Sequence, residues 1–348
     1  MVAIALVKYC LAWPSAPETT RFRSAAQYLI DTFLGVMKCS NDTGIMRRVS
    51  GDYHTAISTE HQIDLVALGR MATLLGLDGG ASLVNICQTY VKGAYVNSGS
   101  EQHYWIGSAE NCGGFNMGDD RPIDTTTWNI LAHADTNNDN LRTALKWVTQ
   151  TCLQTDPIAP GVAFARNRNG PFTSSAQYEN TGAWLLAISE LERISGSNGS
   201  DTWTTEATDT VNAAKSFIEG KILSNVPING AYTNSSDVSG YAGCQAMPGA
   251  CSCIGDGWTY GIVRHLAATV YGVCATMRLS SEIVNSNPYI YVADSGGGGG
   301  GGGGDGGGGG DNTSSGMTTE KALAIAFGVL FGISLIAVIV LAVKLAAK

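Results

Sequence analysis

Four carboxylates, in three separate segments, are the side chains of this sequence best suited to acid–base chemistry. Hydrolysis by acid–base catalysis can use two carboxyl groups, one that donates a proton and one that acts as nucleophile or base. Glu60 and Asp64 stand four residues apart and would share one face of a helix. The catalytic candidates are Glu60, Asp64, Asp124 and Glu179, with Asp119 and Asp120 as alternates.

Two of these carboxylates, Glu60 and Asp124, also have a structural interpretation, whereas the surroundings of Glu179 favour catalysis. Glu60 would begin a helix, where an acidic residue compensates the helix dipole. Asp124 would cap its own helix. Glu179 lies near Tyr178 and Trp184, and an aromatic setting raises the pKa of a carboxyl group toward that of a catalytic acid.

Histidine and aromatic side chains accompany the carboxylates and could bind sugar hydroxyls or stack on sugar rings. Structural hydrogen bonds and core packing are the alternative explanation for both residue types. We find no complete set of metal ligands, no phosphate loop and no nucleophile elbow, so we expect no cofactor. The substrate-binding candidates are His61, Trp128, Trp258, Tyr260 and His265, with Tyr104 and Trp105 as further stacking candidates.

The candidates lie in segments that would form helices with a polar first turn followed by small and apolar residues. A helix that is apolar nearly all round is buried, so these helices should form an inner layer behind more amphipathic ones. If the inner helices run parallel, their polar first turns would line one bowl at the end that attracts oxygen-rich ligands. The four segments begin at Ser58, Pro122, Gln177 and Trp258.

Helical periodicity predominates along the chain, and strand-like alternation is scarce. Because 44% of the residues are apolar and no linker interrupts residues 1–294, we predict one mostly α domain there. Short strands are expected near 2–7 or 288–293. The predicted helices cover 60–76, 79–93, 124–135, 177–194 and 262–278, with amphipathic stripes over 22–37, 141–152 and 203–218.

Four motifs in these segments resemble those of the six-hairpin glycosidase-like superfamily. Ser58-Thr-Glu-His-Gln-Ile-Asp is similar to its STEHN-I/L-D motif, and Asp124-Thr-Thr-Thr-Trp to its LD-x-x-TW segment. Tyr178-Glu-Asn-Thr-Gly resembles EGTAQ, and Trp258-Thr-Tyr with the later Arg264-His265 resembles GW-x-Y followed by PH. Gln62, Asn180 and Arg264 depart from the family's Asn, Gly and Pro.

The resemblance implies a fold and a general role. The fold would be an (α/α)6 toroid of helical hairpins, complete or incomplete, and the role would be associated with carbohydrate. We therefore expect a glycoside hydrolase-like protein that acts on oligo- or polysaccharide. The alternatives are a catalytically inactive carbohydrate-binding or cell-surface interaction protein on the same scaffold, and a lyase or isomerase of similar build.

The C-terminal part of the sequence predicts a membrane anchor. Residues 322–343 carry no charged side chain and would extend ~33 Å as a helix, enough to cross a bilayer core of ~30 Å. Residues 295–321 precede them as a glycine-rich flexible linker, and 344–348 form a short tail. The net charge of −8 argues against nucleic acid as a partner.

Cysteines and glycosylation motifs favour an extracellular or lumenal body. The chain has nine cysteines, and Cys244, Cys251 and Cys253 crowd one loop in which disulfides are expected. Residues 2–7 are a short apolar run for a signal peptide. Either a true start with a signal precedes this sequence, which we favour, or the protein is tail-anchored with a cytosolic body. The Asn-x-Ser/Thr acceptors are Asn41, Asn198, Asn234 and Asn312.

Overall fold

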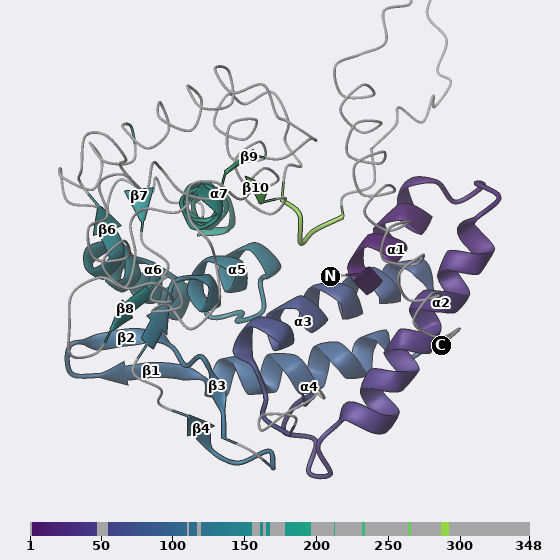
Figure 1. Ribbon diagram of the computed structural model, residues 1–348, viewed down its shortest axis with the longest axis horizontal. Helices are drawn as coiled ribbons and strands as arrows, with labels where there is room; N and C mark the ends of the chain where they lie inside the picture. The colour runs from purple at the N-terminus through teal and green to yellow at the C-terminus, as the bar shows by residue number, and fades with distance from the viewer. Residues whose placement is uncertain are drawn as a thin grey trace, which may run out of the picture.

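The chain is mostly helical, as the sequence predicts (Figure 1). The computed structural model describes residues 2–46, 55–109, 111–116, 120–154, 161–162, 165–167, 178–195, 212, 232–233, 264–265 and 287–291. The helices are α1 (Val2–Ala12), α2 (Thr19–Thr32), the π-helical η1 (Phe33–Met37), α3 (Thr59–Leu75), α4 (Gly80–Gly93), α5 (Asp124–Ala132), α6 (Asn138–Cys152) and α7 (Tyr178–Ser195).

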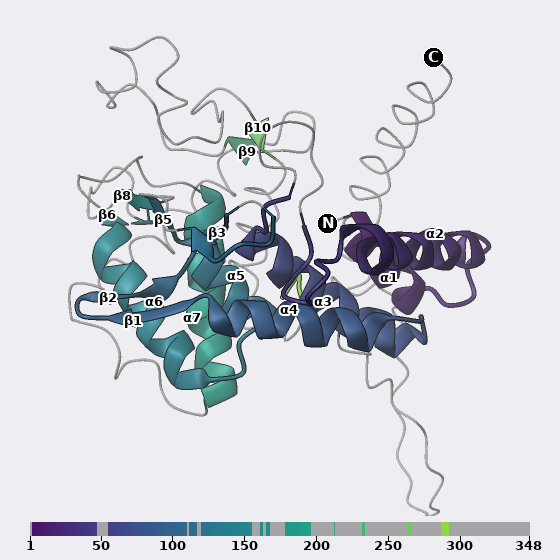
Figure 2. The ribbon, with the colours of Figure 1, turned by 90° about the horizontal axis from the view of Figure 1, so that it is seen from below.

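The strands within the described residues are short and pair only as antiparallel ladders. Figure 2 shows the longest pair, β1–β2, extending from the end of α4 and lying against α6. The pairs are β1 (Tyr95–Ser98) with β2 (Glu101–Tyr104), β3 (Gly107–Ser108) with β4 (Phe115–Asn116), β5 (Asp120–Pro122) with β8 (Ala165–Asn167), β6 (Leu153–Gln154) with β7 (Gly161–Val162), and β9 (Tyr232–Thr233) with β10 (Arg264–His265).

The α3–α4 hairpin depends on glycine both in its turn and in its contact surface. Gly76 ends α3 with φ +71°, and Gly79 precedes α4 with φ +78°, in the left-handed region that favours glycine. Across the hairpin, a Cβ on Gly69 would lie 2.6 Å from the carbonyl oxygen of Gly80. The absence of side chains at these positions therefore allows the two backbones to pack in direct contact.

Helices α3, α5 and α7 run in the same direction, as contacts at both ends show. At their C-terminal ends, the Arg70 guanidinium of α3 donates to the carbonyl oxygens of Ala132 and of His133, the latter at 2.7 Å. The Nε2 atom of His133 lies 2.7 Å from Oε1 of Glu190 in the second half of α7. These contacts join the ends of α3 and α5 to the later turns of α7.

Their N-terminal ends also meet. The segment after β2 contacts the starts of two helices, because the Thr59 N–H donates to Ile106 O at 3.0 Å and the Thr125 hydroxyl donates to Tyr104 O at 3.3 Å. The first turns of α7 join this end through Thr181, whose hydroxyl accepts the Val162 N–H at 3.1 Å. Strand β8, shortly after Val162, pairs with β5 directly before α5. We call this end of the helices the mouth.

The first helical hairpin, α1 and α2, has its helices arranged in the same way relative to α3. Helix α2 begins beside the end of α3, because the Arg23 side chain donates to Leu75 O at 2.8 Å. Since the end of α1 lies beside the start of α2 through Cys10 and Thr19, α1 runs parallel to α3, which it contacts. The described helices therefore alternate in direction, with α1, α3, α5 and α7 parallel to one another.

Burial separates these helices into two layers. Nearly every residue of α5 is buried, as is most of α3 from Gln62 onward, whereas α2 buries only Thr19, Ala26 and Ile30. Helices α4 and α6 bury one face each. Parallel inner helices backed by outer helices are the concentric arrangement that the sequence predicts, within the part of the chain that is described.

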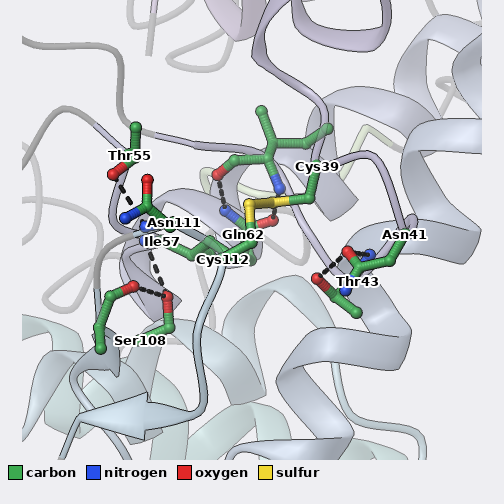
Figure 3. Close-up of a disulfide and its surroundings, with 11 residues drawn as sticks. Cys39, Asn41, Thr43, Thr55, Ile57, Gln62, Ser108, Asn111 and Cys112 are labelled. Atoms are coloured by element: carbon green, nitrogen blue, oxygen red, sulfur yellow. Dashed lines mark hydrogen bonds between the residues drawn. A yellow bond between two sulfur atoms is a disulfide. The ribbon is translucent and has the colours of Figure 1, made fainter.

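A disulfide and a buried glutamine hold residues 38–46, the described segment that follows η1 (Figure 3). Cys39 is bonded to Cys112, 73 residues away in sequence, and closing a loop of this length stabilises the fold by about 4 kcal/mol in the chain-entropy model. The Gln62 amide accepts the Ile45 N–H at 3.0 Å and donates to Ile45 O at 2.9 Å. Gln62 thus holds the main chain at Ile45. Cys10 and Cys87 are buried free thiols, and Cys152 is also buried.

Four secondary-structure predictions differ from the structure. Residues 2–7 form part of α1 rather than a strand, because an uninterrupted apolar run does not reveal its period and Ala3, Ile4, Val7 and Cys10 are buried at helical spacing. Residues 264–265, predicted as helix, pair with β9 as a strand. In the 288–293 region the described residues form a turn rather than a strand. Helix α5 ends three residues early, at a left-handed His133.

Several other predictions concern residues outside the described part of the chain. They include the helix over 203–218 apart from residue 212, the cysteine-rich loop, the linker and the anchor at 322–343. No helix among the described residues has the length and apolarity needed to cross a membrane. The proposed division into body, linker and anchor therefore stays a prediction.

Candidate active site

Asp64 is a buried carboxylate in the second turn of inner helix α3. Its side chain is 9% exposed, and its Oδ1 atom has no hydrogen-bond partner among the described residues. Removal from water raises the pKa of this carboxyl group to about 6. Asp64 can therefore hold a proton at mildly acidic pH, as a general acid must.

Tyr289 was not among the residues predicted from sequence. It lies far along the chain from Asp64 but is only 3% exposed, and its ring centroid lies 6.3 Å from that of Trp128 on α5. Trp128 and Asp64 each follow a mouth carboxylate, Asp124 or Glu60, by one helical turn. These three side chains thus lie one turn below the mouth, and no local sequence signal links Tyr289 to them.

Asp124 is at the start of α5 and interacts with its own helix. The carboxylate accepts the Thr125 N–H at 2.6 Å and is 7% exposed. This contact supports the structural interpretation of Asp124 as a residue that satisfies a first-turn N–H group. Its position at the mouth is nevertheless the one that the sequence predicts.

Glu60, His61 and Glu179 also lie in first turns at the mouth. Glu60 and His61 are half-buried at the start of α3, and Glu179 is the second residue of α7. Nearby Trp184 is fully buried and donates its Nε1–H to the Thr149 hydroxyl at 2.9 Å, so it belongs to the core. The structure thus brings the backbones that carry the four predicted carboxylates to one end of the inner helices.

The other predicted binding residues lie in different parts of the fold or outside its described residues. Trp128 is half-buried near Tyr289, whereas Tyr104 is fully buried and donates to Asp135 Oδ2 at 2.8 Å, which makes it a core residue. His265 lies in strand β10 and not at a helix start. Trp258 and Tyr260 lie outside the described residues, as does the alternate Asp119, while Asp120 begins β5.

A cluster of Arg121, His103 and Glu101, of which Arg121 and His103 are buried, borders the mouth and was missed in the sequence. The Arg121 guanidinium lies 4.8 Å from the centroid of the Trp105 ring, so it covers one face of a predicted stacking residue. Its NH2 atom lies 3.6 Å from Oε2 of Glu101, which also faces His103. Burial lowers the pKa of His103. Trp105 consequently has one face available at most for a sugar ring.

The described residues contain no group of three or more His, Cys, Asp or Glu side chains arranged to hold a metal ion. Glu60, Asp124 and Glu179 lie at the mouth itself. One turn below it are Asp64, whose pKa is raised, and the half-buried Trp128. Such an arrangement is suited to proton transfer to a neutral, hydroxyl-rich substrate.

Comparison with protein-family models and with curated proteins finds no match. Among solved structures, a possible member of the GH105 family from Salmonella enterica subsp. enterica serovar Paratyphi A str. ATCC 9150 has a TM-score of 0.53 and 10% identity, over 81% of this chain and 71% of that one. Another possible GH105 member, from Klebsiella pneumoniae subsp. pneumoniae MGH 78578, has a TM-score of 0.50 and 10% identity, over 80% and 70%.

A glycoside hydrolase family 76 mannosidase from Bacteroides thetaiotaomicron VPI-5482 has a TM-score of 0.43 and 10% identity, over 62% of this chain and 58% of that one. The chain thus spans less than two thirds of the length of this mannosidase. At such low identity the comparisons establish the fold alone. With the helix directions above, the two GH105 similarities show that the chain shares the helical fold of those two proteins.

Proposed function

We propose that this protein is a membrane-tethered glycoside hydrolase-like enzyme that acts on oligo- or polysaccharide through a carboxylate pair. The observation that carries the proposal is Asp64, a carboxyl group that is buried below the mouth and has a pKa of about 6. A buried acid with an oxygen left unpartnered is costly to stability, so its presence is best explained by chemistry. Its partner would be Glu60, Asp124 or Glu179.

The roles follow from position and protonation. Asp64, protonated at mildly acidic pH, would donate its proton to the leaving-group oxygen. An ionised carboxylate nearer the mouth would act as nucleophile or would activate water. Trp128, His61, Trp258, Tyr260 and His265 are the proposed contacts to the sugar, by stacking or by hydrogen bonds to hydroxyls.

The second candidate function is a carbohydrate-binding protein without catalysis on the same scaffold. The contact between Asp124 and the Thr125 N–H favours it, because a carboxylate that caps its own helix is less available to a substrate. A bowl with one functional carboxyl group could bind sugars through aromatic and polar side chains but could not complete the two-carboxyl reaction.

A panel of oligo- and polysaccharides separates the two functions when the detergent-solubilised full chain is tested for both hydrolysis and glycan-array binding. Hydrolysis that is lost in Glu60→Gln or Glu179→Gln, with thermal stability nearly unchanged, would support the enzyme. Glycan binding without any hydrolysis by the wild-type protein would support the binding protein. If each of the four carboxylates could be replaced singly without lowering the rate of hydrolysis, none of them would take part in the mechanism.

The same proposal places the body outside the cell or in a secretory lumen, with 322–343 as the anchor and 295–321 as the linker. Two features support this side. The Cys39–Cys112 disulfide is favoured by an oxidising compartment. The glycan acceptor Asn41 lies in the exposed loop beside that disulfide (Figure 3). The alternative is a tail-anchored protein with a cytosolic body.

A further inference from the structure

A short segment after β2 runs beside the residues that lead into α3. The Thr59 N–H donates to Ile106 O at 3.0 Å, and the Ser108 N–H donates to Ile57 O at 2.8 Å. These two bonds flank an antiparallel bridge directly before α3, so the segment and the approach to the helix form one short ladder. We call this segment the strap, and it comprises residues 106–109 and 111–112.

The strap takes the place of a cap at the start of α3. Ser58 precedes the helix, but within the described part of the chain its side chain makes no capping hydrogen bond. The first N–H groups of an α-helix have no partner inside the helix. Here the first of them, on Thr59, is satisfied by the Ile106 carbonyl of the strap. The position of the first turn of α3 therefore depends on a part of the chain that lies beyond α4 and β2.

Ser108 holds both polar backbone groups of Ile57, two residues before α3 begins (Figure 3). Besides the bond from its N–H, its side-chain hydroxyl accepts the Ile57 N–H at 3.0 Å and donates to Ala109 O at 3.0 Å. Ser108 is only 5% exposed, so water does not readily replace these bonds. Gly107 permits the close approach, because a Cβ there would lie 2.3 Å from Ile57 O.

The far end of the strap is fixed by the disulfide and by a side chain. Cys112 is bonded to Cys39, and the Asn111 N–H donates to the Thr55 hydroxyl oxygen at 2.8 Å. Asn111 and Cys112 both have a φ of +56°, in the left-handed region that is costly for residues other than glycine. Such a conformation persists where surrounding contacts hold it. The disulfide and the Thr55 contact therefore keep the strap in register with α3.

We propose that Ser108 is a positioning residue, which acts through the strap to set Glu60 and His61 at the mouth. This inference rests on the proposed function, because it gives Glu60 a place in the carboxylate pair. Glu60 follows Ile57 by three residues, so a main chain clamped at Ile57 leaves the first turn of α3 little freedom to move. A shift of about 1 Å in a reacting group can lower a rate about 100-fold. The strap thereby links the geometry of the mouth to the disulfide.

The test uses Ser108→Ala in the full chain, with Ser24→Ala as the matched control. Both variants lose one serine hydroxyl that bonds main chain, but the Ser24 hydroxyl donates to Thr20 O within α2. Hydrogen–deuterium exchange is measured by mass spectrometry in a peptide that covers residues 55–62. Loss of one hydrogen bond changes an opening equilibrium roughly 2- to 10-fold, so exchange of this peptide should be faster by that factor in Ser108→Ala and unchanged in Ser24→Ala.

A second variant tests the strap without changing Ser108. The double substitution Cys39→Ala with Cys112→Ala removes the disulfide that fixes the far end of the strap. Exchange over residues 55–62 should again be faster, while the second half of α3 stays protected. Wild-type exchange over 55–62 in this variant would overturn the role of the strap, even if Ser108→Ala did not fold.

Kinetics then separate positioning from stability. On the first glycan that the panel shows to be cleaved, well below the unfolding midpoint, Ser108→Ala should lower kcat by about 10- to 100-fold and change KM much less. Ser24→Ala should change neither constant. A wild-type kcat in Ser108→Ala, with only a lower unfolding midpoint, would overturn the positioning role. Faster exchange over 55–62 in a protein whose wild type hydrolyses nothing would support the strap but overturn the proposed function.

Discussion

At the residue scale, Asp64 is a candidate catalytic residue whose burial also destabilises the folded protein when its carboxyl group is ionised. Its catalytic role was predicted from its spacing to Glu60 and from the motif that contains both residues. The sequence did not indicate that Asp64 would be far more buried than Glu60, since both lie on one helix face. Tyr289, whose ring lies near that of Trp128, could not be predicted from one sequence, because its position depends on a distant part of the chain.

Replacement of Asp64 by Asn should stabilise the protein at neutral pH. The folded-state pKa of about 6 exceeds the usual value for Asp, so ionisation of Asp64 destabilises the fold as pH rises through this range. Two pKa units correspond to about 3 kcal/mol. Urea unfolding should show a gain of this order at pH 7 and nearly none at pH 4.

The control for this substitution is Asp78→Asn, which removes the same charge from an exposed position in the α3–α4 turn. It should change the free energy of unfolding little at either pH. If Asp64→Asn were as stable as wild type at both pH values, the burial that we assign to this carboxyl group would be wrong.

At the element scale, the amphipathic and buried helices were predictable, whereas their connections were not. The prediction of 60–76, 79–93 and 177–194 agrees closely with α3, α4 and α7 because their apolar periodicity and their glycine or polar ends are local signals. Helix α1 and the strand pairs between helices were missed, since an apolar run has no clear period and a two-residue ladder leaves almost no pattern.

The link between α5 and α7 should make the fold sensitive to acid. Burial alone would raise the pKa of Glu190, but hydrogen bonds from His133 and Arg193 lower it to about 2. A depressed pKa stabilises the fold above the unfolded-state value, and this stability is lost as pH falls from about 4.3 toward 2. Glu190→Gln should therefore lose up to about 3 kcal/mol at pH 6 and much less near pH 2.

Urea unfolding at the two pH values measures this difference, with Glu192→Gln as the control on the exposed side of the same helix. The control removes a similar negative charge without the His133 and Arg193 contacts described for Glu190. Equal pH dependence of stability in wild type and Glu190→Gln would show that this carboxylate does not link the two helices.

At the scale of the whole molecule, the fold of the described part was predictable through the motif resemblance, and its position in the cell was not. Parallel inner helices explain why four separated polar segments meet at one end. Nothing in the described residues concerns the anchor at 322–343, and only the Cys39–Cys112 disulfide and the exposed Asn41 bear on the side of the membrane. Those statements depend on the glycine-rich composition, the apolar run, the cysteines and the glycosylation motifs.

The proposed side of the membrane predicts a glycan on Asn41. This residue and Thr43 are exposed, and the Asn41 Oδ1 accepts the Thr43 hydroxyl at 2.7 Å. In cells that express the protein from its start-corrected gene, endoglycosidase treatment should increase gel mobility, and Asn41→Gln should remove one step of that shift. Reactivity of Cys39 and Cys112 with a thiol reagent, without any glycan, would instead support a cytosolic body.

The most direct test of the proposed activity is the pH dependence of kcat/KM for wild type and Asp64→Asn on the first glycan that the panel shows to be cleaved. Because Asp64 must carry a proton, the wild-type rate should fall about tenfold per unit above pH 6. Asp64→Asn should be slower by about 10²–10⁴-fold, without that limb and without loss of stability. A rate within a few fold of wild type in Asp64→Asn, with the same alkaline limb, would contradict the account.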